Sequence, residues 1–198
     1  MASERERPHV QRAREQYLER LPSLDPKKLI FIDEAGAHRS MTSEYGWAPV
    51  GQRLHISVPR NRGRITTMLG ALGWRGLRAL MTVEGGTTKD VFLRFVSDHL
   101  VPVLRPGDVV VLDNLGAHHA TGVRQAIEAA GATVLYLPPY SPELNPIELC
   151  WSKLKRLLKR RGVRARAMLE QFIHWLAEFI TASDAQSWFK HCGYTQRE

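Results

Sequence analysis

Three short apolar runs constrain the fold of this sequence most strongly. Residues 29–32, Val109–Leu112 and 133–137 each have the length of a β-strand and carry almost no polar side chain. Strands without an alternating polar face are typical of sheets that are covered on both sides. Because helical patterns follow the second and third runs, the order of elements predicts an α/β fold, with a mixed sheet flanked by helices on both faces.

The remaining elements follow from turn signals and helical periodicity. Segments 65–72 and 77–83 flank a glycine-bounded turn and predict a hairpin, and 47–58 predicts a further strand region with Trp47 in the core. Helices are expected over 87–100, 122–130, 146–159 and 167–181. In this interpretation residues 1–27 form a charged linker or residual helix outside the core. Residues 28–185 form one domain, and residues 186–198 form a C-terminal tail.

The charge of the chain is uneven. Its 198 residues carry 28 basic and 20 acidic side chains, a net charge of +8, and segment 147–166 holds eight of the basic residues against one acid. Such a segment is either a solvated helix face or a surface for the phosphates of nucleic acid. The candidate DNA-binding residues are Lys153, Lys155, Arg156, Lys159 and Arg160. No apolar run is long enough to span a membrane, and the expected location is the cytoplasm, with association with the nucleoid when DNA is bound.

Two of the apolar strands end in aspartate. Asp33 follows Ile32, and Asp113 follows Leu112. Taken alone, each aspartate is better explained as a residue that forms a turn or caps a helix. Ligands of open α/β sheets bind at the carboxyl ends of the strands, however, and two carboxylates that meet there require a proton or a cation. Together they are therefore candidates for a metal site.

Glu148 is the third candidate acid. Asn145 and Pro146 precede it as the expected cap and first residue of a helix, so Glu148 also fits a capping box. On that helix Glu148 shares a face with Lys155 and Lys159. A carboxylate at the head of a basic stripe suits metal-assisted chemistry on a phosphate backbone.

These residues resemble a known family. The sequence has an aspartate after its first strand, GWAPVG at 46–51, an Asp-Asn pair with His118 after its second, and LPPYSPELNPIE at 137–148. This combination is similar to the DDE catalytic domain of mariner-type insertion-sequence transposases, over about residues 28–185. The 34 residues between Asp113 and Glu148 agree with that family's spacing.

The resemblance implies an RNase H-like fold in which Asp33, Asp113 and Glu148 are the catalytic residues. They would bind two Mg²⁺ ions, with Mn²⁺ as a substitute, for cleavage of DNA and transfer of the freed 3′ end to target DNA. Asn114 and His118 match the family pattern and are candidates for a helper role, or for a structural role at the following helix.

The resemblance also implies partners. These are double-stranded DNA at transposon ends and target, a homodimer on that DNA, and a helix-turn-helix module that binds the ends. Residues 1–27 are too few for such a module, so we expect it from another reading frame or a longer chain. Three alternatives remain: a non-catalytic DNA-binding remnant, an RNase H-like nuclease, and a two-carboxylate hydrolase such as a glycosidase.

Overall fold

The computed structural model describes residues 3–43, 45–55, 57–113, 121–163 and 165–195. Five strands form one mixed sheet in the order β3-β2-β1-β4-β5. β1, β2 and β3 pair antiparallel, whereas β1, β4 and β5 are parallel. Their bounds are Leu29–Ala37 (β1), Thr66–Gly73 (β2), Gly76–Glu84 (β3), Val109–Leu112 (β4) and Thr133–Tyr136 (β5).

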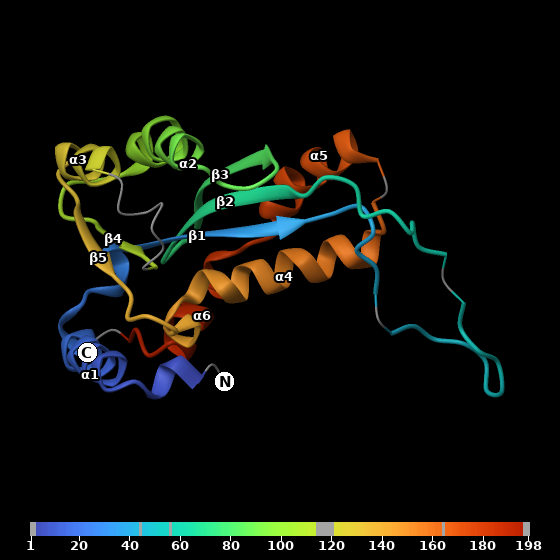
Figure 1. Ribbon diagram of the computed structural model, residues 1–198, viewed down its shortest axis with the longest axis horizontal. Coiled ribbons are helices and arrows are strands. Elements are labelled where there is room, and N and C mark those ends of the chain that lie inside the picture. The colour runs from blue at the N-terminus through green and yellow to red at the C-terminus, as the bar shows by residue number, and fades with distance from the viewer. Residues whose placement is uncertain (1–2, 44, 56, 114–120, 164, 196–198) are drawn as a thin grey trace.

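Helices cover both faces of this sheet, as the apolar runs predict. Phe31 and Ile32 are both fully buried, but they point to opposite faces and belong to two separate cores. One core packs under α2 (Lys89–Phe95), its π-helical continuation η4 (Val96–Leu100) and α3 (Thr121–Ala129). The other lies under α4 (Pro146–Arg161), α5 (Arg166–Ala177) and α6 (Ala182–His191), and Figure 1 shows α2 and α4 on opposite sides of β1.

The C-terminal segment is more structured than its sequence suggested. The helix expected over 167–181 ends at Ala177, and Thr181 begins a new helix, α6, through a capping box with Asp184. Residues 186–198 were expected to be a tail, yet Phe189 and Tyr194 are buried in the main core. The prediction missed the Thr-x-x-Asp cap at 181–184, which is the sequence signal for a helix start.

The N-terminal segment likewise packs on the domain. The helix α1 (Pro8–Arg20) buries Val10 and Tyr17, and Tyr17 is part of the main core. The short 3₁₀ turns η1 (Ser3–Glu6), η2 (Leu21–Ser23) and η3 (Pro26–Lys28) flank it. The expectation that residues 1–27 lie outside the core is therefore wrong for α1, because its two apolar side chains are shielded from water by the rest of the domain.

The connection between β1 and β2 contains no strand among its described residues. The strand expected over 47–58 is absent there, and the segment extends away from the domain beyond the end of α4 (Figure 1). Trp47 is 99% exposed, so its predicted place in the core is also wrong. Pro49 and Gly51 disfavour pairing, and the described apolar side chains Trp47, Val50, Leu54 and Val58 are exposed. Within the described residues no helix combines the length and apolar character needed to cross a membrane.

Candidate active site

Asp33 lies inside β1 and faces the helix α4. Its side chain is only 7% exposed. The indole Nε1 of Trp151, on α4, donates a hydrogen bond of 3.1 Å to Asp33 Oδ2. Together with a backbone hydrogen bond at Glu34, this contact fixes the orientation of the carboxylate.

A glycine makes room for this arrangement. Gly70 on β2 is paired directly with Asp33 across the antiparallel ladder. A Cβ atom at Gly70 would lie 2.5 Å from Cη2 of Trp151, a separation that real Cβ atoms do not adopt. The indole therefore lies over the backbone of β2, and its N–H reaches β1.

The strand register places Asp113 beside Asp33. Phe31 pairs with Val111 in the parallel ladder of β1 and β4, and continuing that register by two residues aligns Asp33 with Asp113. Neighbouring strands are about 4.8 Å apart, and residues in register point to the same face. Asp113 follows the end of β4 directly, so its carboxylate lies at the edge of the sheet where the parallel strands end.

Glu148 reaches the same place from the first turn of α4. The expected capping box is not formed, because Asn145, the residue before the helix, makes no capping hydrogen bond with its side chain. The face of α4 next to Glu148 is apolar, and Ile147, Trp151 and Leu154 on it are buried against the sheet. Packing of this face turns Glu148 toward the two aspartates.

Burial and the neighbouring acids raise the pKa values of Asp33 and Glu148. Burial, followed by the charges of Glu148 and then Asp113, raises the pKa of Asp33 to about 7, although hydrogen bonds from the backbone of Glu34 and from Trp151 oppose that shift. Burial also raises the pKa of Glu148, and Asp113 adds to this effect while Lys155 opposes it. Such mutual destabilisation of negative charge is what a bound cation relieves.

All three acids line one cavity of about 520 Å³. Residues 137–142 and Asn145 form much of its wall, and Arg7 and His9 from the N-terminal segment contribute as well. In this wall Tyr140 has a φ of 55°, in the left-handed region that non-glycine residues rarely occupy. Backbone strain of this kind is concentrated at functional sites.

The oxygen atoms around this cavity suit a hard divalent cation. Asn145 contributes an Oδ1 atom that is buried and has no hydrogen-bond partner, in addition to the three carboxylates. Mg²⁺ prefers such oxygen ligands and keeps several waters. Within the described residues no three His, Cys, Asp or Glu side chains are close enough to enclose an ion by themselves. The acids thus share a cavity but do not form a complete coordination shell.

The helix α1 supports the proline-rich wall of the cavity. Arg14 donates to Ser141 Oγ and also pairs with Glu143 at 2.6 Å, as Arg5 does. Behind the loop, Tyr17 bonds to the hydroxyl of Tyr194 at 2.8 Å. Tyr194 in turn donates to the carbonyl of Leu144 at 2.8 Å. The loop before Glu148 is therefore held from two sides.

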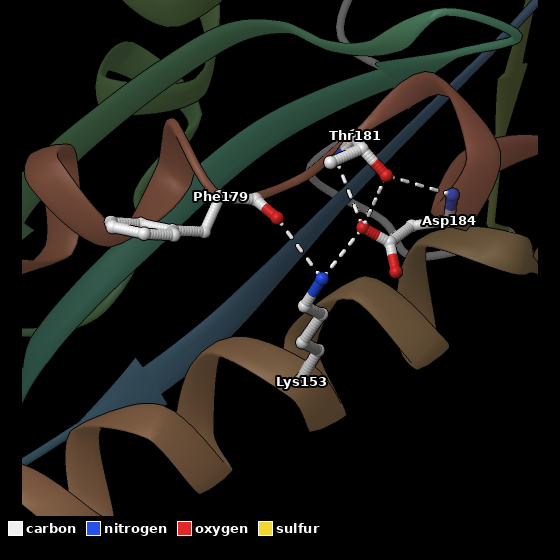
Figure 2. A network of polar contacts seen from close by, with 4 residues as sticks. All are labelled: Lys153, Phe179, Thr181 and Asp184. Atoms are coloured by element: carbon white, nitrogen blue, oxygen red, sulfur yellow. Dashed lines mark hydrogen bonds and ion pairs between the residues drawn. The ribbon is translucent and has the colours of Figure 1, made fainter.

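The basic residues of α4 separate into two groups. Lys155, Arg156, Lys159 and Arg160 line a larger cleft of about 1010 Å³ together with the exposed rings of Tyr45 and Trp47. The fifth candidate, Lys153, points elsewhere (Figure 2).

Lys153 joins α4 to the start of α6. Its Nζ pairs with Asp184 Oδ2 at 2.6 Å and donates to the carbonyl of Phe179 at 3.0 Å, and Thr181 shares the same carboxylate (Figure 2). The pairing with Lys153 and Thr181 lowers the pKa of Asp184 despite partial burial. The other two candidates from the sequence, Asn114 and His118, lie outside the described residues.

Comparison with known proteins identifies the class of this fold and site. The family model for the DDE superfamily endonuclease matches residues 28–185. The chain belongs to this family, as the resemblance in its motifs predicted. A search of curated proteins gives no match.

Solved structures show the same fold. The Mos1 mariner paired end complex with Mn matches with a TM-score of 0.78 and 17% identity, covering 97% of this chain and 60% of that one. The Mos1 strand transfer complex matches with a TM-score of 0.75 and 19% identity, covering 98% of this chain and 59% of that one. The catalytic domain of Mos1 mariner transposase matches with a TM-score of 0.66 and 15% identity, covering 98% of this chain and 89% of that one. The predicted RNase H-like fold is thereby confirmed. This chain spans about 60% of the length of the chains in the first two complexes.

Proposed function

We propose that this chain is the catalytic domain of a mariner-type transposase, which cleaves DNA at transposon ends and joins the freed 3′ end to target DNA. Membership of the DDE endonuclease family supports this proposal. So does the fold, which is similar to Mos1 structures described as paired end and strand transfer complexes.

The observation that carries the proposal is the meeting of Asp33, Asp113 and Glu148 at one cavity, with the pKa values of Asp33 and Glu148 raised. In the proposal these acids hold two Mg²⁺ ions, or Mn²⁺ as a substitute, and structures of Mos1 are described with each of these metals. Metal ions at such a site supply Lewis acidity at the phosphate and lower the pKa of a bound water.

The chain itself supplies orientation and charge. Trp151 holds one oxygen of Asp33, so the carboxylate enters the reaction in a fixed orientation. Downstream of Glu148 the basic face of α4 receives the DNA backbone in the proposal. Lys155 and Lys159 lie seven and eleven residues after Glu148, or roughly 10 and 16 Å along the helix. They therefore span several nucleotides beyond the cleaved bond.

The cleft beside α4 also offers two aromatic rings. Tyr45 and Trp47 are 87% and 99% exposed, and exposed rings next to cations are typical of surfaces that bind nucleic acid. We assign the DNA contacts to Lys155, Arg156, Lys159 and Arg160, and leave out Lys153 because it is engaged with Asp184.

We further propose that the working assembly is a homodimer on paired transposon ends in the cytoplasm, associated with the nucleoid. Sequence-specific recognition of those ends belongs to a helix-turn-helix module in this proposal. The description of Mos1 structures as paired end complexes supports the dimer.

Crystals soaked in Mn²⁺ test the acid site directly. We expect anomalous density among Asp33, Asp113 and Glu148 in the wild-type chain and its loss in Asp33→Asn, while Asp90→Asn, an exposed acid on α2, retains it. Density elsewhere, or density that persists in Asp33→Asn, contradicts the metal site. Cleavage of duplex DNA compared with an RNA–DNA hybrid then distinguishes a transposase from an RNase H-like nuclease.

A further inference from the structure

A second basic cavity lies at the other end of the sheet. Its volume is about 440 Å³. Lys27 and Lys28 contribute from η3, directly before β1. Arg75 and Arg78 come from the β2–β3 hairpin, and Arg105 from the loop before β4. The only acid in its wall, within the described residues, is Asp108.

This cavity is separate from the acid site. Lys28 precedes β1 and Asp108 precedes β4, so the cavity lies where the parallel strands begin, whereas Asp113 lies where they end. Five residues of extended strand separate Lys28 from Asp33, which is roughly 16 Å. The two cavities share no lining residue, so a ligand of this cavity does not contact the acids directly.

The protein sets one acid, Asp108, against the five cations of the cavity. In the part of the chain that the structure describes, none of the five cationic side chains forms an ion pair. Asp108 accepts a hydrogen bond of 2.9 Å from the backbone N–H of Arg105. Like charges gathered in this way repel one another and raise the local concentration of anions.

The elements that carry these cations are fixed in place. Trp74, in the hairpin turn, packs edge-on against the buried ring of Phe189 with centroids 5.5 Å apart. Arg78 donates to the carbonyl of Val103, which ties the hairpin to the loop before β4. The basic cavity is thus preorganised, which reduces the entropy lost when a ligand binds.

We propose that this cavity binds backbone phosphates of DNA at a distance from the bond that is cleaved. Five cations from three separate segments exceed what one small anion requires, but they match successive phosphates of a strand. The identification of the polyanion as DNA rests on the proposed function. The site would add affinity without reading sequence, since contacts to phosphates position DNA and do not specify it.

Salt-dependent binding of DNA tests the proposal. The full chain is titrated with a fluorescent 30-base-pair duplex of arbitrary sequence at 50–300 mM salt, with EDTA present so that nothing is cleaved. In the variant Lys28→Gln/Arg75→Gln/Arg105→Gln we expect the slope of log K against log salt to become shallower by about 0.9 for each phosphate that the protein no longer neutralises, or roughly 2 to 3 in total.

A variant with the same change in net charge is the control. Arg12→Gln/Lys89→Gln/Arg94→Gln removes three exposed cations away from both cavities, and we expect its slope to stay close to that of the wild type. Equal slopes in the two triple variants overturn the proposal, because only net charge would then matter. Absence of duplex binding by the wild-type chain at 50 mM salt also overturns it. Thermal melting of each variant confirms that it is folded.

Two further measurements distinguish this proposal from a site for small anions and from the proposed metal site at the acids. If inorganic phosphate raises the melting temperature of the wild type but not of the cavity variant, while the slopes for DNA agree, the site binds small anions and the proposal is wrong. Mn²⁺ binding by the cavity variant should equal that of the wild type. A loss of Mn²⁺ binding only in Asp33→Asn then reports on the proposed function alone.

Discussion

Trp151 Nε1 on α4 donates a hydrogen bond of 3.1 Å to Oδ2 of Asp33 on β1, and this contact ties one of the three acids to the helix that carries another. Trp151 lies three residues after Glu148 on α4, so the helix that presents Glu148 also orients Asp33. The relative position of the two carboxylates therefore depends on how α4 packs against β1 and β2.

Replacing Trp151 with phenylalanine tests the value of this hydrogen bond. The ring of Trp151→Phe still fills most of the buried space, but Asp33 loses its donor. Removing an outer partner of a metal ligand commonly costs 10–100-fold in metal affinity or activity, and we expect Mn²⁺ affinity measured by calorimetry to fall by about tenfold. Trp188→Phe on α6 should bind Mn²⁺ like the wild type. Unchanged affinity in Trp151→Phe would show that the hydrogen bond does not position Asp33.

Gly70→Ala should destabilise the protein. The added methyl group would lie 2.5 Å from Trp151 Cη2, and overpacking of a core usually costs about 1–3 kcal/mol. Urea denaturation measures this loss in the free energy of unfolding. Gly86→Ala is the matched control, because a Cβ there meets nothing within 4 Å. Equal stability of the two variants would mean that α4 can move away from β2 at little cost.

Stability without metal should decrease as the pH rises. Because the pKa of Asp33 is about 7 in the folded chain and about 4 when unfolded, the folded state binds more protons between these values. Its stability therefore falls through that window, by up to roughly 4 kcal/mol, and then levels off. We expect Asp33→Asn to be more stable than the wild type at pH 8 in EDTA. Parallel pH profiles of unfolding for the two proteins would contradict the raised pKa.

The N-terminal helix should contribute to the stability of the whole domain. Tyr17 is 6% exposed and reaches Tyr194, so Tyr17→Ala removes both core packing and a hydrogen bond. Large-to-small substitutions at such positions cost about 3 kcal/mol. In the control Tyr45→Ala, a ring that is 87% exposed is removed, and the change should stay within about 0.5 kcal/mol. If Tyr17→Ala unfolds like the wild type, α1 is only loosely attached.

The sheet could be predicted because its central strands are apolar on both faces. The predicted strand 109–112 agrees with β4 (Val109–Leu112) residue for residue, and all four ends of the hairpin strands agree with β2 and β3 to within one residue. Predictions failed where tertiary context decides. Trp47, Val50, Leu54 and Val58 are exposed. The charged helix α1 buries only two side chains, Val10 and Tyr17.

The acid site was predictable only in part. Asp33 and Asp113 could be placed because both follow parallel strands, and the parallel register aligns them. The hydrogen bond from Trp151 and the space left by Gly70 connect elements that are far apart in sequence, so no local pattern indicates them. The side chain of Lys153 was grouped with its basic neighbours, although helical geometry turns it toward Asp184.

The contact between Trp151 and Gly70 also limits how this chain can change over time. As long as the indole occupies the space above β2, position 70 tolerates no side chain, and a substitution there is acceptable only after the ring at 151 has become smaller. A smaller ring gives up the donor to Asp33 at the same moment. Positions 151 and 70 should therefore vary together among relatives. Lineages that keep tryptophan at position 151 should keep glycine at position 70.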